Sequence, residues 1–403
     1  MGECDREEPF MAHSQPLGAS RCILLHRPSL RLLRGRVLPT AARREGFMRH
    51  PSLLTGLVLC PIMLAACGEN TTEPTQVADQ LTTTELAVAG NTWLTRANMP
   101  ADRTRLAAAT ITNAAGQSIV YAIGGLTPTG NPSDKVTAYN VATNTWTFRR
   151  PLPEPLAETN GAGVIDGRIY VSGGYSDPDF PTSALYMYDP ARNAWTEKTG
   201  IPTVTVNGER QYGLGLGVTG VIGGRLYVVS GCFMAWEPWG YYEECNPLFY
   251  RYNPVTDRWT TLPRPFAGEG VGSPYAGGVI GGKFYLMAGS WYTREGRLAV
   301  YDPATNRWTA KTPLGLERPG AATAVLEGKL YVMGGRRYNA QREAYEPLDI
   351  TIVYDPATDT WTRRAPLTSA RSDIAASRVF VGGKARIEVV GGRRPGNNLQ
   401  YVP

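Results

Sequence analysis

Histidine is scarce in this sequence, and its three copies, His13, His26 and His50, all lie in the first fifty positions. The rest of the chain therefore offers no Ser-His-Asp triad, no histidine-ligated zinc or copper site and no histidine acid–base catalysis. A phosphate-binding glycine loop is also missing, because the glycine run from Gly213 lies in a β context without a following helix. We expect no metal and no other cofactor.

Charged residues make up only 19% of the sequence, and the net charge is +6. Residues 1–67 hold nine arginines and five acidic residues, which supply +4 of that total and leave +2 for the remainder. Such a mixed surface lacks the concentrated positive patch that nucleic-acid binding needs. No nucleic-acid partner is expected.

Long apolar runs are confined to residues 48–67, which read MRHPSLLTGLVLCPIMLAAC. The run is short for a membrane span and contains Pro61, so an export signal fits better than a transmembrane helix. Its end, Leu64-Ala65-Ala66-Cys67, resembles the lipobox of bacterial lipoproteins. That resemblance implies a lipid on Cys67, a place in the bacterial cell envelope and membrane contact only through the lipid. The alternative is an ordinary cleaved signal with an incidental cysteine.

The signal divides the chain into four parts. Residues 1–47 are an arginine-rich stretch ahead of Met48, which we interpret as an extension from a mis-assigned start. Residues 48–67 are the signal, 68–88 a flexible Thr-rich tether, and 89–403 the folded domain. Only Cys232 and Cys245 fall in that domain, and in an oxidising compartment they are predicted to form a disulfide. The alternative is two free thiols.

Two sequence motifs recur along residues 89–403. The first has the form Tyr301-Asp-Pro-Ala-Thr-Asn-Arg-Trp308, in which the Asp-Pro pair sets a tight turn. The second has the form Lys329-Leu-Tyr-Val-Met-Gly-Gly335, an alternating strand that ends in a small doublet. The doublet recurs six times. One unit cannot bury both faces alone, so the units must stack and close.

These motifs resemble those of the kelch family. By that resemblance, the six small-residue doublets imply an all-β, six-bladed β-propeller of four-stranded antiparallel blades. The chain ends at Tyr401-Val-Pro403 without the usual Asn-x-Trp strand, which instead stands near the other end as Asn91-Thr-Trp93. The N-terminal strand is therefore predicted to complete the last blade. Galactose oxidase has a similar propeller, but its copper site needs histidines, so that activity is not expected here.

Three tryptophans, Trp236, Trp239 and Trp291, fall outside the repeat. They lie in predicted loops of two adjacent blades, together with tyrosines that share those loops: Tyr241, Tyr242 and Tyr292. Exposed aromatic rings beside carboxylates suit stacking on a sugar ring or gripping a peptide. The alternative is that the longer loop, Cys232–Cys245, folds over and plugs its own blade.

Charged residues recur between blades near each innermost strand and are predicted to converge on the axis. They would form a polar mouth able to bind carboxylates through arginine, or they would pair with one another. The arginines predicted to bind ligand there are Arg105, Arg210, Arg318, Arg336, Arg371 and Arg393, and the neighbouring residues of the set include Arg103, Glu317 and Asp373.

Three functions remain open. The first is a monomeric module that binds a protein or carbohydrate ligand through the mouth. The second is a small-sugar enzyme resembling the periplasmic kelch mutarotase of sialic acid. Its acid–base candidates would be Glu158, Glu209 and Glu269, with Arg210 and Arg371 for a substrate carboxylate. The third is a structural envelope protein.

Overall fold

The computed structural model describes residues 91–177, 180–206, 209–237, 240–266, 271–290, 295–392 and 397–403. The chain divides into two compact units, residues 1–70 and 71–403, and every described residue belongs to the second. The predicted extension, signal, tether and lipid site at Cys67 lie outside the described residues. Within the described ranges, no helix is long and apolar enough to cross a membrane.

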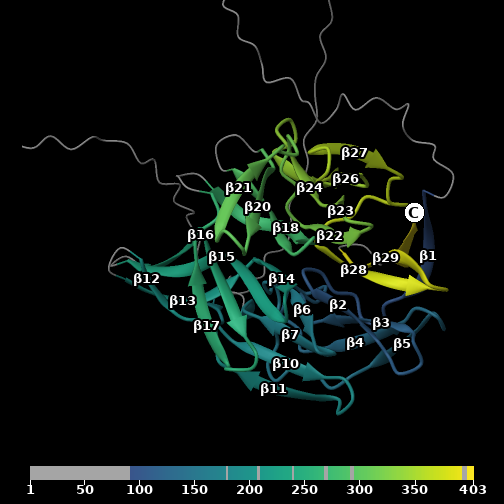
Figure 1. Cartoon of the computed structure of the whole chain (residues 1–403), viewed down its shortest axis with the longest axis horizontal. Helices are drawn as coiled ribbons and strands as arrows, with labels where there is room; N and C mark the ends of the chain where they lie inside the picture. Colours follow the sequence, from purple (N-terminus) through teal and green to yellow (C-terminus); the bar gives the residue numbers. More distant parts are fainter. Residues whose placement is uncertain are drawn as a thin grey trace, which may run out of the picture. The chain divides into compact units, whose positions relative to one another are not determined.

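Six antiparallel sheets surround a central axis, which confirms the predicted six-bladed propeller (Figure 1). The innermost strands of neighbouring blades contact one another in a closed ring. In each blade the innermost strand is given first. Blade 1 consists of β2 (Ala107–Thr112), β3 (Ser118–Ile123), β4 (Val136–Asn140) and β5 (Thr145–Phe148), and blade 2 of β6 (Ala162–Ile165), β7 (Arg168–Ser172), β10 (Leu185–Asp189) and β11 (Ala194–Lys198). Blade 3 consists of β14 (Val218–Ile222), β15 (Arg225–Glu237), β16 (Gly240–Asn253) and β17 (Arg258–Leu262), and blade 4 of β18 (Val271–Ile280), β19 (Lys283–Ser290), β20 (Arg297–Asp302) and β21 (Arg307–Lys311). Blade 5 consists of β22 (Ala321–Leu326), β23 (Lys329–Gly334), β26 (Thr351–Asp355) and β27 (Thr360–Arg364), and blade 6 of β28 (Ile374–Val381), β29 (Lys384–Gly391), β30 (Asn397–Val402) and β1 (Thr92–Asn98).

Blade 3 departs from the four-stranded pattern. The segment predicted as the loop Cys232–Cys245 instead continues β15 and β16 as a long hairpin, and β13 (Glu209–Gly215) pairs with its edge. β12 (Val204–Val206) then pairs with β13. Extending two hydrogen-bonded strands exposes new edge groups, and the added strands satisfy them. Blades 2 and 5 carry smaller hairpins at the same point, namely β8 (Tyr175–Asp177) with β9 (Phe180–Pro181), and β24 (Arg336–Asn339) with β25 (Ala344–Pro347).

The repeat tyrosines build the contact between blades. In five of the six interfaces, the tyrosine of the second strand packs on a tyrosine of the next blade's third strand, with ring centroids 5.5–6.2 Å apart. Both faces of a blade are covered by its neighbours, so second strands such as β3 are buried along their length. The outermost strands, such as β5, are mostly exposed.

The repeat tryptophan joins each blade to the one before it by donating its indole N–H to a carbonyl of the preceding connector. In five blades the Asn or Asp two positions earlier also accepts that connector's amide. At blade 1, for example, Trp146 donates to the Ala97 carbonyl at 3.0 Å and Asn144 accepts the Ala97 amide at 2.9 Å. All six tryptophans make the indole bond, namely Trp93 to Ala365, Trp146 to Ala97, Trp195 to Arg150, Trp259 to Thr199, Trp308 to Pro263 and Trp361 to Thr312.

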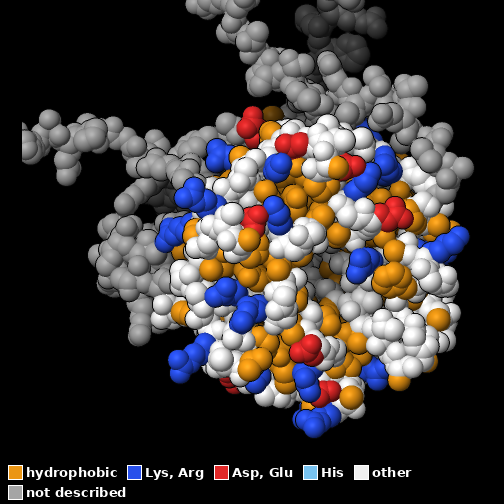
Figure 2. All heavy atoms as spheres, in the orientation of Figure 1, with side chains coloured by type: hydrophobic (Ala, Val, Ile, Leu, Met, Phe, Trp, Pro, Cys, Tyr) orange, Lys and Arg blue, Asp and Glu red, His pale blue; other side chains and the backbone are white. Residues whose placement is uncertain are grey.

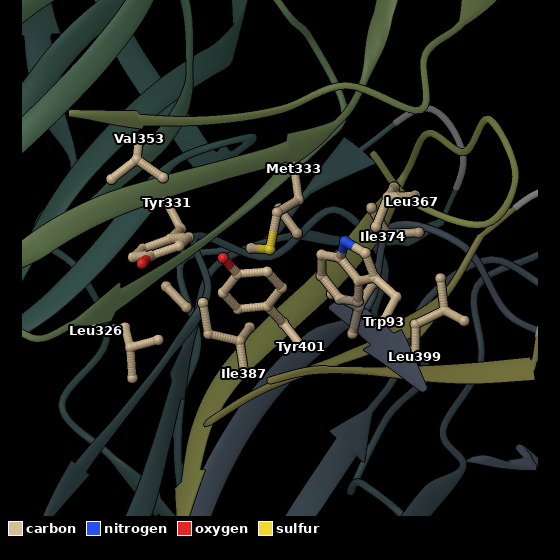
Figure 3. Packing of buried hydrophobic residues seen from close by; sticks show 13 residues of the cluster. Trp93, Leu326, Tyr331, Met333, Val353, Leu367, Ile374, Ile387, Leu399 and Tyr401 are labelled. Carbon is tan, nitrogen blue, oxygen red and sulfur yellow. The ribbon is translucent and has the colours of Figure 1, made fainter. Parts of the chain in front are cut away.

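The last blade closes as predicted. β1 pairs antiparallel with β30, with Trp93 opposite Tyr401, and lies beside the C-terminal strands in Figure 1. Figure 3 shows Tyr401 between Trp93 and Tyr331, with ring centroids 5.1 and 5.5 Å apart. The buried cluster around them joins blades 5 and 6, and Trp93 of the N-terminal strand is part of it.

The seam between blades 6 and 1 is polar where the other seams are tyrosine-rich. Glu388 occupies the place of the second-strand tyrosine and is fully buried, as are Asn398 and Gln400 beside it on β30. Burial raises the pKa of Glu388 to about 8, although the nearby polar groups of Gln400 and Tyr139 and the charges of Arg96 and Arg386 oppose the rise. This joint therefore holds a titratable group inside the protein.

The small doublets are required by close packing at the axis. Gly125 has a φ of 99°, and a Cβ placed on it would lie 2.6 Å from the carbonyl oxygen of Thr104. Any larger residue would collide with the backbone of the incoming connector. The doublets thus let the connectors reach the axis, where the candidate site lies.

Candidate functional site: the axial mouth

A channel with a volume of 490 Å³ follows the axis and is lined by the innermost strands of all six blades. Figure 2 shows the hollow at the centre of the face in view, with Lys and Arg side chains around it. Most lining side chains are small. Hydroxyl groups tie alternate pairs of blades together inside the channel at 2.7 Å, namely Thr110 to Ser377, Thr219 to the Asn160 carbonyl and Thr323 to the Gly277 carbonyl.

Five residues in the left-handed conformation form an arc at the channel entrance. Each lies just before an innermost strand, and four hydrogen bonds of 2.8–3.0 Å join them, in which the N–H of one residue donates to the carbonyl of its counterpart in the preceding blade. In order, the arc runs Gly320, Asp373, Arg105, Glu158 and Leu216, with φ between 52° and 72°. Non-glycine residues adopt this conformation uncommonly. The arc fixes the backbone beneath three charged side chains.

Those three side chains and one more form a chain of ion pairs across the mouth. Arg105 contacts Glu158 through Nη1, and its Nε lies 3.4 Å from Oδ1 of Asp373. Arg336 reaches Oδ2 of Asp373 at 3.6 Å. Asp373 is buried, whereas the side chains of Arg105 and Arg336 are 28% and 26% exposed. Two cations and two carboxylates thus balance, with the arginines at the surface.

A second set of arginines lies two residues earlier and is buried. Arg103 is 1% exposed and donates to the carbonyls of Gly124 and Lys135 and to the Thr137 hydroxyl. Arg318 and Arg371 have the same position in blades 5 and 6 and are 1% and 8% exposed. Arg318 and Arg371, which were predicted to bind ligand at the mouth, are thus buried, and that role stays a prediction.

Burial changes the electrostatics of these arginines without neutralising them. Desolvation lowers the pKa of Arg103 and of Arg318 to about 10 each. Both guanidinium groups therefore stay charged at neutral pH, and that of Arg103 is held by carbonyl and hydroxyl oxygens. A cation bonded in this way fixes the connector against its blade.

The aromatic residues predicted to bind ligand are only partly placed. Trp239, Trp291 and Tyr292 lie outside the described residues, as do Arg393 and Glu269. The backbone of Trp236, Tyr241 and Tyr242 belongs to the β15–β16 hairpin, with Trp236 opposite Tyr241, and Glu209 and Arg210 belong to β13. The side chains of all five lie outside what the structure describes. The same hairpin places Cys232 directly opposite Cys245.

The β24–β25 hairpin carries an aromatic group that was not predicted. Tyr345 is 49% exposed, its ring centroid lies 5.4 Å from that of Tyr338, and the Arg336 guanidinium lies 5.2 Å from the Tyr345 ring centroid. Arg336 thereby links the hairpin to Asp373 at the mouth. The sequence signal that could have predicted this group is the doublet Gly334-Gly335 followed by two arginines and a tyrosine. The segment after the doublet leads away from the axis, so these residues lie beside the mouth.

The described groups of the mouth suit the recognition of a partner. Glu158, the acid–base candidate whose side chain is described, is engaged by Arg105. No group of three or more His, Cys, Asp and Glu side chains suited to a metal occurs among the described residues. An exposed tyrosine, two partly exposed arginines and paired carboxylates are groups that partner proteins contact.

The repeat is also found by comparison with known families. The model described as Kelch motif matches residues 110–153, 160–200 and 317–368. Each matched range spans most or all of one blade, and the three ranges fall in blades 1, 2 and 5.

Several curated proteins are similar over part of their length. "Kelch-like protein terF" of Aspergillus terreus is 29% identical over 49% of this chain and 42% of its own length. "Kelch-like protein 30" of Homo sapiens is 31% identical over 32% and 21%, and "Beta-scruin" of Limulus polyphemus 29% over 37% and 16%. The chain thus spans less than half of these relatives. The solved "Structure of YjhT" shares the fold with a TM-score of 0.56 and 16% identity, over 76% of this chain and 95% of that one.

Proposed function

Because the chain is a kelch-repeat β-propeller, we propose that it is a binding module whose mouth face holds a protein partner. Kelch-repeat proteins are typically protein-binding modules. The observation that supports this use most directly is the joined group of Tyr345, Arg336 and Asp373. It offers an exposed aromatic ring and a cation on a backbone that is already fixed.

Preorganisation is what makes the mouth suited to binding. A partner that replaces water around Tyr345 and Arg336 meets side chains whose positions are restrained by ring and ion-pair contacts. Less side-chain entropy is then lost on association. Aromatic and arginine side chains also contribute more than most residues to protein interfaces.

The place of action is a second part of the proposal. Residues 48–67 support export, and Cys67 supports a lipid anchor that would hold residues 89–403 on the envelope side of a membrane. Metabolic labelling with an alkyne fatty acid tests it. Labelling of the full chain, lost in Cys67→Ser and kept in Cys60→Ser, supports the anchor. An unlabelled chain contradicts it.

Site-specific photocrosslinking in cells tests the mouth. A photoreactive phenylalanine replaces Tyr345 in one variant and Phe148, which is 60% exposed on β5, in a matched control. We expect a discrete crosslinked protein from position 345 that disappears when Arg336→Ala is added, and none from position 148. Equal crosslinking at both positions, or none at 345, would contradict binding at the mouth.

A further inference from the structure

A groove of 690 Å³ lies between blades 1 and 2, away from the mouth. It is bordered by the β2–β3 turn and by the turns after β6 and β10. Arg105 precedes β2, so the groove and the mouth lie at opposite ends of that strand. The volume falls within the range of about 300–1,000 Å³ that is usual for small-molecule sites.

The groove exists because one side chain of blade 1 is small. The residue before the third-strand tyrosine faces the next blade, and in blade 1 it is Ala138. The other blades have Met187, Arg251, Val300, Val353 and Gln400 at this position. With Ala138 in their place, the side chains of Ile119 and Tyr121 line the floor of the groove. The floor is therefore apolar with one aromatic ring.

The outer wall is a rigid turn found in blade 1. Other first turns have two residues, such as Asp166-Gly167, but here the chain runs from Asn113 to Gln117. Oδ1 of Asn113 accepts the amides of Ala115 and Gln117, and the amide nitrogens of Asn113 and Asn140 both donate to Oε1 of Gln117. Each of these two amide groups keeps one further N–H for another acceptor.

The charges around the groove balance. Arg168 pairs with Asp189 at 3.7 Å, and Arg149 stands at the edge with Asp166. Two cations and two carboxylates leave no net charge, which disfavours a strongly ionic ligand. Amide, guanidinium, carboxylate and hydroxyl groups together offer donors and acceptors, which matches a ligand rich in hydroxyl groups.

From the apolar floor, the rigid polar wall and the balanced charge, we propose that this groove binds a neutral mono- or disaccharide. Tyr121 and Ala138 are only 5% and 2% exposed. The ring face of the sugar would therefore lie over the partly exposed side chains of Ile111 and Pro190, where its C–H groups meet apolar surface. Its hydroxyls would bond to Asp166, Arg149 and the amide groups of Asn113 and Asn140. This site is separate from the mouth, and its occupancy does not depend on a protein partner there.

An array of neutral saccharides probed with the full chain, followed by calorimetric titration of the sugars that bind, tests the proposal. Ala138→Met gives blade 1 the side chain that blade 2 has as Met187, fills the groove and should weaken binding at least tenfold. Ala142→Met is the matched control, because Ala142 is exposed and does not line the groove.

A second pair of variants covers a folding defect in the first. Asp166→Asn keeps a residue type that tolerates the φ of 49° while removing the carboxylate, and should also weaken binding about tenfold. Glu327→Gln makes the same change in the equivalent turn of blade 5, where φ is 52°, and should leave binding unchanged. Absence of binding to every neutral saccharide on the array, or binding that neither groove variant weakens, would overturn the proposal.

Discussion

The Tyr401 hydroxyl donates a 2.6 Å hydrogen bond to Oδ1 of Asn91, which joins residues 310 positions apart in the chain. The other five blades make the same bond between residues only five apart, as in Tyr139 to Asn144 and Tyr188 to Asn193. The closing joint thus reproduces the local geometry of a continuous blade, and its side chains should be as important to stability as those of any other blade.

Trp93→Ala should lower the free energy of unfolding by about 3–5 kcal/mol, because it opens a cavity and removes the indole bond to Ala365. Urea unfolding followed by circular dichroism measures the change. Leu94→Ala is the matched control on the same strand, since Leu94 is 40% exposed, and should change stability by less than about 0.5 kcal/mol. A similar small effect for both variants would contradict a core role for β1.

Asn144→Ala should destabilise the protein more than Asn306→Ala, by about 1 kcal/mol. Both asparagines have a φ of 57° and accept a tyrosine hydroxyl. Asn144 also accepts the Ala97 amide, whereas the connector residue that faces blade 4 is Pro263, which has no N–H. Paired chemical denaturation curves measure the difference, and equal losses would show that the connector bond contributes nothing.

The stability of the protein should fall as pH rises from about 4.5 to about 8. The pKa of Glu388 is about 8 in the folded protein, above its usual value of 4.5. A carboxyl group shifted upward contributes its full stability below the unfolded pKa and loses it as pH rises through the folded pKa. The slope should approach about 1.4 kcal/mol per pH unit. The charged or titratable groups around Glu388 are Arg96, Arg386 and Tyr139.

Glu388→Gln isolates this effect, because the amide cannot ionise. The variant should match the parent near pH 5 and exceed it in melting temperature near pH 9. Glu327→Gln, in an exposed turn, should follow the parent at every pH. A Glu388→Gln variant with the parent's pH profile would show that the carboxyl group is not titrating at the seam.

Cys232 and Cys245 should titrate as a disulfide once the chain is exported. They face each other in an antiparallel pair, where Cα atoms lie about 4.5–5.5 Å apart, within the range that a disulfide spans. Closing this short loop should contribute about 3 kcal/mol. Thiol titration of the unfolded mature protein should find neither cysteine free before reduction and both afterwards. Two reactive thiols before reduction would contradict the bond.

The number of blades and the closure of the ring were predictable because each repeat carries the same short sequence motifs. The Asp302 side chain accepts the amide of Ala304 in its turn, as the Asp-Pro motif requires. Asn91-Thr-Trp93 supplies the Asn-x-Trp strand that is missing after Tyr401, and Asn91 accepts the Tyr401 hydroxyl. The mouth was less predictable. Arg103 and Arg105 are two residues apart, yet one is buried and the other is 28% exposed, because the left-handed turn at Arg105 reverses the side-chain direction. Sequence spacing does not encode that reversal.

The groove was not predicted at all. Ala138 is one alanine in an otherwise regular strand, and its meaning depends on what the next blade places opposite it. The loop predicted in blade 3 was wrong for a related reason, because the long insertion extends paired strands and does not form a free loop. Ligand binding by its aromatic residues stays a prediction. The recurring sequence motifs specify the blades, whereas the candidate binding sites depend on the residues in which one blade differs from the others.

The pairing of β1 with β30 also bears on how the chain could be rearranged. Residues 92 and 402 are direct partners, so a short linker could join the two ends of the propeller without disturbing either strand. A circularly permuted chain that starts in the exposed turn between Thr127 and Asn131 would then make blade 6 continuous and would divide blade 1 between β3 and β4. In such a permutant an N-terminal tether would leave from blade 1, so the attachment point could be moved relative to the mouth while the ring stays the same.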